Sequence, residues 1–94
     1  MRKITQQAVR AFNANESFSK DNTKVTADHS STKMFLFGNC IAIKDQEGTR
    51  VSHAGWVTRT TFERLNGLDR VRVCIRKGQA YLNGEQWDGN FIKI

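Results

Sequence analysis

The chain has 94 residues, of which 38% are hydrophobic and 26% are charged. This length predicts one domain over residues 1–94 with one modest core, and the composition is that of a globular rather than a disordered chain. No stretch approaches the ~18 apolar residues of a membrane span, so no membrane partner is expected. The basic start is followed by Thr5-Gln6-Gln7 instead of an apolar run, which argues against a signal peptide.

Basic residues outnumber acidic ones, with 15 Lys and Arg against nine Asp and Glu and a net charge of +6. This balance favours an anionic partner such as nucleic acid, a nucleotide or an acidic protein face. A small soluble protein can also carry this charge without such a partner. The balance argues against a DNA-mimicking inhibitor, because a mimic of DNA should be acidic.

The residue types that usually carry catalysis or bind metals show no functional spacing. Cys40, Cys74, His29 and His53 form no CxxC or HxxxH pair, so no metal site is expected. We expect both cysteines to be reduced core residues, with a disulfide between neighbouring strands as the alternative. Ser52 and His53 are adjacent on a predicted strand, so their side chains point to opposite faces. We therefore predict a non-enzymatic protein without catalytic residues or cofactors.

Helical periodicity marks the first predicted element, residues 4–13. Thr5 suits the N-cap position of this helix. Residues 23–27 then have the character of a short edge strand. The apolar positions of the helix that share one face are Ile4, Ala8, Val9 and Phe12.

Residues 33–53 carry the clearest strand pattern. Gly38-Asn39 separates two apolar runs, and glycine in the first place of a two-residue loop favours a type II′ hairpin. In that register Leu36 faces Ile41, while Phe35, Phe37, Cys40 and Ala42 point the other way. Because both faces are apolar, we expect either central strands or a hairpin covered by a helix on one side and by more chain or a partner subunit on the other. A more polar strand over 49–53 follows.

The next stretch predicts a short helix and a basic strand. Thr60 and Glu63 have the spacing of a capping box, and Gly67 suits the left-handed residue that ends a helix. After it, Val71, Val73 and Ile75 alternate with Arg70, Arg72, Cys74 and Arg76. This alternation predicts a strand with arginines on one face.

Turn residues organise the C-terminal part. Lys77-Gly78 and Asn83-Gly84 predict hairpins, and the second places Tyr81 opposite Gln86. A last segment covers residues 91–94. We therefore predict an α+β fold, in which an N-terminal amphipathic helix and one short helix pack on an antiparallel β-meander of roughly six or seven strands.

The arginine row is the candidate binding surface. Arginines in strand alternation project from one sheet face, and aromatic rings beside them suit base stacking. The alternative is that these arginines are the solvated side of an ordinary strand and that Trp56 and Trp87 belong to the core. The predicted nucleic-acid-binding residues are Arg59, Arg64, Arg70, Arg72, Arg76, Lys77, Trp56 and Tyr81.

Several turn and packing motifs are similar to those of a known group. With AGW at 54–56, TTFERLNG at 60–67, GQAYLNG at 78–84, EQWDG at 85–89 and the GNCIA hairpin at 38–42, the chain resembles a group of small tailed-bacteriophage proteins. Those proteins also begin like MRKIT at 1–5. The resemblance covers most of the chain and implies a phage origin and the host cytoplasm. It carries over no catalytic residues.

For a protein of phage origin, three kinds of partner are candidates. The first is nucleic acid on the arginine face. The second is a host or defence protein inhibited by binding, which would make this a host-takeover or counter-defence protein. The third is a signalling nucleotide sequestered in a pocket. Homodimerisation by strand pairing or through the apolar 34–43 hairpin is a further expectation.

Overall fold

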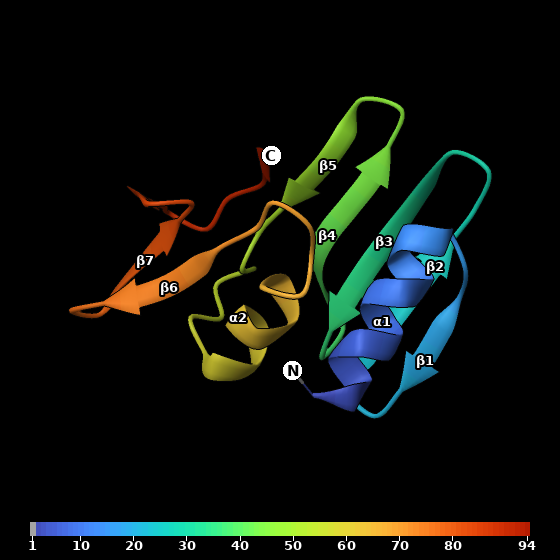
Figure 1. Ribbon diagram of the computed structural model, residues 1–94, viewed down its shortest axis with the longest axis horizontal. Helices are drawn as coiled ribbons and strands as arrows, with labels where there is room; N and C mark the ends of the chain where they lie inside the picture. Colours follow the sequence, from blue (N-terminus) through green and yellow to red (C-terminus); the bar gives the residue numbers. More distant parts are fainter. Residues whose placement is uncertain (1) are drawn as a thin grey trace.

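The computed structural model describes residues 2–94 and contains two helices and two antiparallel sheets (Figure 1). Met1, which opens the N-terminal motif, lies outside the described residues. Strands β1-β2-β3-β4-β5-β9 form a six-stranded sheet in that order, and β6-β7-β8 form a three-stranded one. The α+β prediction is confirmed, although two sheets replace the single meander. The elements are α1 (Lys3–Ala14), β1 (Phe18–Lys20), β2 (Thr23–Ala27), β3 (Ser31–Leu36), β4 (Asn39–Asp45), β5 (Gly48–Val51), α2 (Arg59–Leu65), β6 (Val73–Arg76), β7 (Gln79–Leu82), β8 (Glu85–Gln86) and β9 (Ile92–Lys93).

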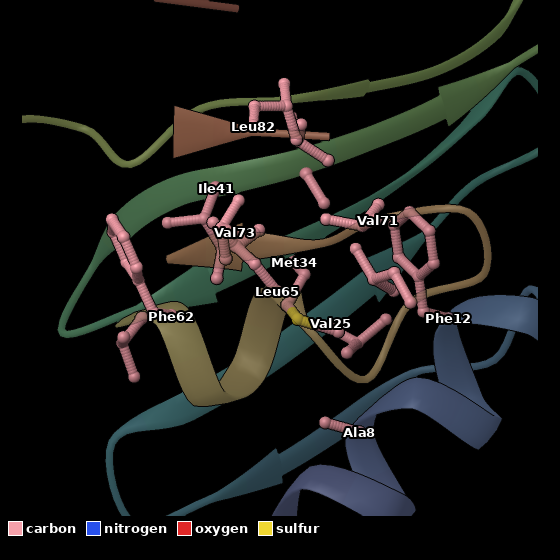
Figure 2. Close-up of a cluster of buried hydrophobic side chains, with 14 of the residues drawn as sticks. Ala8, Phe12, Val25, Met34, Ile41, Phe62, Leu65, Val71, Val73 and Leu82 are labelled. Atoms are coloured by element: carbon pink, nitrogen blue, oxygen red, sulfur yellow. The ribbon is translucent and has the colours of Figure 1, made fainter. Parts of the chain in front are cut away.

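Both helices lie on the same side of the six-stranded sheet (Figure 1). Helix α1 packs over β1, β2 and β3, while α2 contacts β4 and β6. The core fills the space between the helices and the sheet, and the start of the second sheet enters the same core (Figure 2). Its members include Phe12 of α1, Val25, Met34 and Ile41 of the large sheet, Leu65 of α2, and Val71 and Val73 before and in β6.

Helix α1 confirms the helical prediction with one more residue at each end. The N-cap is Arg2, without a capping side chain, so the prediction that Thr5 caps the helix is wrong. Thr5 is fully buried inside the helix, and its hydroxyl donates a hydrogen bond to the Glu63 carboxylate of α2. A tertiary hydrogen bond therefore uses the hydroxyl that local capping would have needed.

The β3–β4 hairpin turns one residue earlier than predicted. The turn residues are Phe37 and Gly38, whose φ angles of 51° and 81° are those of a type I′ turn. Leu36 consequently pairs with Asn39, and the predicted register is wrong. A β-bulge in β4 then brings Ile41 and Ala42 into the core together. Strand β2 is also not an edge strand, because β1 pairs with its outer side.

Helix α2 begins with a different cap from the predicted one. The N-cap is Thr58, whose hydroxyl oxygen accepts a hydrogen bond from the Thr61 N–H at 3.2 Å. The capping box of Thr60 and Glu63 is wrong, because Glu63 points toward Thr5 of α1.

Gly67 follows α2 and does not adopt the predicted left-handed conformation. Its role is a close approach between α1 and the end of α2. A Cβ atom at this position would lie 2.8 Å from Cγ2 of Val9 and 2.9 Å from Cγ2 of Thr5. A glycine is therefore needed at position 67, as the sequence indicated. The reason is the close packing of the two helices and not a left-handed backbone angle.

The predicted strand over 70–76 begins only at Val73. Arg70 has a φ of 63° and lies in a turn. Two asparagine side chains take the place of strand partners in this region. Asn83 accepts from the Arg72 N–H at 2.8 Å and donates to the Arg70 carbonyl at 3.1 Å. Asn66 accepts from the Val73 N–H at 2.7 Å and donates to the carbonyl of the same residue at 3.0 Å.

The two C-terminal hairpins are confirmed, and so is the pairing of Tyr81 with Gln86. After β8 the chain returns to the large sheet, where β9 pairs with β5. Strand β5 ends at Val51, earlier than predicted. The next two residues hold the returning chain, because the Gly89 carbonyl accepts from the Ser52 hydroxyl at 2.6 Å and from the His53 N–H at 3.2 Å.

Candidate nucleic-acid interface

The structure separates the predicted interface residues instead of placing them on one face. Part of the set does lie together, on the outer side of the three-stranded sheet, and one member is buried. The positions are as follows: Arg76 and Tyr81 on the outer face of β6 and β7, Arg72 directly before β6, Arg70 and Lys77 in the turns that bound β6, Trp56 before α2, Arg59 at the first residue of α2, and Arg64 in the core.

Arg64 cannot contact a nucleic acid, so this part of the prediction is wrong. Its side chain is 1% exposed. The guanidinium donates to the hydroxyls of Thr23 at 3.0 Å and Thr5 at 2.8 Å, and it forms an ion pair with Glu63 at 2.5 Å. We call Arg64, Thr5, Thr23 and Glu63 the Arg64 cluster. Arginine is almost never fully buried without partners, and two of these partners, Thr5 and Thr23, come from segments that are distant in the chain.

The Arg64 cluster also sets the ionisation of Glu63. Burial raises the pKa of this carboxyl, but three favourable contacts outweigh burial. These are the hydrogen bond from the Thr5 hydroxyl, the one from the Arg2 N–H at 3.2 Å, and the positive charge of Arg64. The pKa of Glu63 is therefore held below its ordinary value of 4.5.

A lowered carboxyl pKa adds stability above the ordinary pKa, and that stability is lost as the pH falls through the lowered value. Glu63→Gln should therefore be less stable than the wild type near neutral pH, and the difference should shrink once the pH falls below 4.5. Urea midpoints measured against pH test this. Asp28→Asn is the control, because backbone N–H groups of Ser30 and Ser31 lower the pKa of Asp28 to about 2. The stability difference of this variant should therefore shrink only at a lower pH than that of Glu63→Gln. A difference that stays constant down to about pH 3 would contradict the assignment.

We call the outer side of the three-stranded sheet the hairpin face. It is formed by Cys74, Arg76, Tyr81 and Gln86 of the strands and by Arg72 directly before β6. The Arg76 guanidinium lies 5.7 Å from the centre of the Tyr81 ring, within the range of a cation–π contact. A hollow of about 430 Å³ opens here, and no carboxylate lies among the residues that line it. Two guanidinium forks beside one aromatic ring suit phosphate oxygens and a base ring.

Trp56 and Trp87 divide between the surface and the core. Trp87 is 7% exposed, and its indole N–H donates to the Asn90 carbonyl at 3.0 Å. Trp56 is 52% exposed, but it does not join the hairpin face. It lines a hollow of about 170 Å³ together with Phe37, which is 66% exposed. Arg59 is exposed at the first turn of α2.

A second basic surface went unpredicted. The side of the six-stranded sheet opposite the helices, which we call the open face, carries two rows of paired residues across the strands. This surface could not be predicted from the sequence, because it depends on the pairing register of β2 and β3. Lys33 and Phe35 become neighbours of Lys24 only once that register is known. Their alternation with the buried Met34 and Leu36 was the available signal. The rows are Ser19, Lys24, Phe35 and Cys40, and Thr26, Lys33, Ile43, Arg50 and Lys93.

Both thiols are free, and they lie on different surfaces. Cys40 is half-buried on the open face, whereas Cys74 is exposed on the hairpin face, so the prediction of a core position is wrong for Cys74. Within residues 2–94, no three His, Cys, Asp or Glu side chains are grouped so that they could hold a metal ion. Neither of the helices described there has the length and apolar character to cross a membrane.

Comparison with known proteins identifies the family. The model of the family described as Kyanoviridae Gp96 protein matches residues 1–93. No curated protein and no solved structure matches the chain. Because the match spans almost the whole sequence, it confirms the resemblance to small tailed-phage proteins. The chain belongs to the Kyanoviridae Gp96 family, a family of tailed-cyanophage proteins.

Proposed function

We propose that this phage protein is a non-enzymatic nucleic-acid-binding protein that acts in the host cytoplasm through its hairpin face. The observation that carries the proposal is that the exposed Arg76 of β6 and the exposed Arg72 directly before this strand line one hollow together with Tyr81. Arginine donates two parallel hydrogen bonds to phosphate oxygens, and a tyrosine ring offers a flat surface to a base. The net charge of +6 favours approach of the polyanion.

The charge around the hairpin face supports the same reading. Lys77 lies in the β6–β7 turn and continues the basic row at the tip of the hairpin. Glu85 belongs to the opposite side of the sheet, because it pairs with the buried Leu82. The face therefore presents cations to a ligand without a carboxylate of β8 among them.

The backbone under the hairpin face is fixed before any ligand arrives. The Asn66 and Asn83 side chains hold the peptide groups of Val73 and Arg72. Less ordering entropy is then lost on binding. Because the contacts offered are to phosphates and to base rings rather than to base edges, we expect affinity with little sequence preference.

Arg72→Ala combined with Arg76→Ala tests this proposal. The double variant should bind a labelled oligonucleotide about tenfold or more weakly, since two charge-assisted hydrogen bonds are lost. The slope of log affinity against log salt should become shallower by about 1.4, or 0.7 for each phosphate contact to a single strand. Fluorescence anisotropy measures both quantities.

The matched control for that experiment is Arg10→Ala combined with Lys20→Ala. It removes the same charge from α1 and β1, which lie at the other end of the molecule from β6 and β7 (Figure 1). This control should retain most of the affinity. Equal losses in the two double variants would show that only net charge matters and would overturn the hairpin face as the site.

Counter-defence or host takeover by binding a host protein is a second candidate function. It is supported by large apolar side chains that remain exposed: Phe37 and Trp56 line one hollow, and Val57 follows Trp56 in the chain. Exposed aromatic clusters are typical of protein interfaces. A host protein that stays bound at high salt after nuclease treatment would favour this candidate over nucleic acid.

A further inference from the structure

We infer that the open face is a second nucleic-acid surface, one that takes a single strand by stacking its bases on Phe35 and Phe37 and holding its phosphates with Lys24 and Lys33. The inference rests on the proposed function, because it specifies which form of nucleic acid the protein recognises. It concerns a different surface, however, since the open face belongs to the six-stranded sheet and the hairpin face to the three-stranded one.

The register of the strands places cations on two sides of one ring. Lys24 pairs directly with Phe35 across β2 and β3, and Lys33 lies two residues before Phe35 on the same face of β3. Paired strands lie about 4.8 Å apart, so an ammonium group and a ring on adjacent strands reach the same nucleotide. Arg50, which lies further along the face, is held by Asp45 at 2.6 Å.

Phe35 and Phe37 line a hollow of about 530 Å³ at one end of the open face. Lys24, Ser19 and Thr26 belong to its wall as well. This volume falls in the range of about 300–1,000 Å³ that small-molecule ligands occupy. The hollow can therefore admit a nucleobase together with its sugar.

The rim of the hollow is already in place without a ligand. Phe37 has a φ of 51°, a conformation that non-glycine residues rarely adopt, and its N–H donates to the Asn22 carbonyl at 2.8 Å. This hydrogen bond ties the β3–β4 turn to the β1–β2 turn. It fixes the backbone of a residue whose side chain is 66% exposed, which is where a stacking surface needs to be.

The chemistry of the hollow favours single strands over duplexes. An aromatic ring reaches the flat side of a base only when the base is unpaired and unstacked. Asp21 also lines the hollow, and its carboxylate repels a phosphate but can accept a hydrogen bond from a base N–H, such as the N3–H of thymine. The base is thus expected inside the hollow, and the phosphates along the lysines outside it.

Each surface carries one free thiol, which makes a direct test possible. Cys40 pairs with Phe35 on the open face, and Cys74 pairs with Tyr81 on the hairpin face. The wild-type protein is alkylated with iodoacetamide alone, with a short oligothymidylate, or with a short DNA duplex, and both thiols are followed by mass spectrometry. Burial raises the pKa of Cys40, so the reaction is run at alkaline pH and each thiol is compared with itself.

The expected result is that oligothymidylate slows the alkylation of both thiols. The duplex, which the hairpin-face arginines can hold by its phosphates alone, should slow that of Cys74 only. Phe35→Leu combined with Phe37→Leu keeps the apolar surface but removes the rings. This variant should bind oligothymidylate about tenfold or more weakly, because stacking on an aromatic side chain is lost, and should bind the duplex as the wild type does. Protection of Cys40 should disappear, while that of Cys74 remains.

The outcomes separate this inference from the proposed function. Protection of Cys74 without protection of Cys40 at saturating oligothymidylate would overturn the open face and leave the hairpin face standing. Protection of Cys40 alone would support the open face and overturn the hairpin face. Protection of Cys40 without any oligonucleotide, rising with protein concentration, would show that a second copy of the chain covers the open face and would overturn the inference.

Discussion

Arg64→Met is expected to destabilise the protein by about 3 kcal/mol or more, because breaking a buried ion pair leaves its partner without compensation. Methionine fills much of the arginine volume but donates no hydrogen bond. The hydroxyls of Thr5 and Thr23 would lose their donor, and Glu63 would lose its counter-charge. Urea unfolding followed by tryptophan fluorescence measures the free energy of unfolding.

Arg59→Met is the matched control for this experiment. It makes the same substitution on the same short helix, but at an exposed position, so a change within about 0.5 kcal/mol is expected. If both variants lost the same stability, the effect would come from charge or helix propensity. The Arg64 cluster would then not be the link between α1, α2 and β2 that the geometry indicates.

Gly89→Ala should have a comparably large effect. A Cβ atom at this position would lie 1.9 Å from Cε1 and 2.0 Å from Nε2 of His53. The His53 ring is itself packed, with ring centroids 5.0 Å from Trp87 and 6.4 Å from Phe62. Because the ring has no free space to retreat into, we expect a loss of about 3 kcal/mol in the free energy of unfolding, from overpacking combined with the left-handed backbone.

Gly84→Ala separates the effect of overpacking from the effect of the left-handed backbone. Gly84 has the same φ of +89° as Gly89, but nothing lies within 4 Å of its Cβ position. This control should cost only about 1 kcal/mol, the ordinary penalty of a left-handed alanine. Equal losses in the two variants, measured by urea unfolding, would contradict the role of His53 as the surface against which the returning C-terminal chain is packed.

Local signals in the sequence predicted much of the fold. Helical periodicity located α1, and Asn83-Gly84 fixed a hairpin whose register is confirmed at Tyr81 and Gln86. These features depend on neighbours in the chain, which a sequence displays directly. The roles of Thr5 and Gly67 were predicted wrongly. A buried hydrogen bond and a close approach of two helices involve segments that are distant in sequence.

The candidate site was predicted in part for the same reason. Arg76 and Tyr81 share a face because strand side chains alternate with a period of two, which can be read from sequence. Arg72 lies before the strand and lines the same hollow. Arg64 could not be placed, since its burial depends on hydroxyls from α1 and β2. The open face could be predicted only with the pairing register of β2 and β3, which the sequence does not show. The β3–β4 register was predicted wrongly, because the turn lies at Phe37-Gly38.

We propose that this phage protein holds nucleic acid through phosphate contacts and aromatic rings. The most direct test is fluorescence anisotropy of a labelled single-stranded oligonucleotide with the wild-type protein over a range of salt concentrations. We predict binding at low salt whose log affinity falls against log salt with a slope of about −1.4 or steeper, from at least the two hairpin-face arginines. Absence of binding at low salt, or an affinity that does not change with salt, would contradict the account.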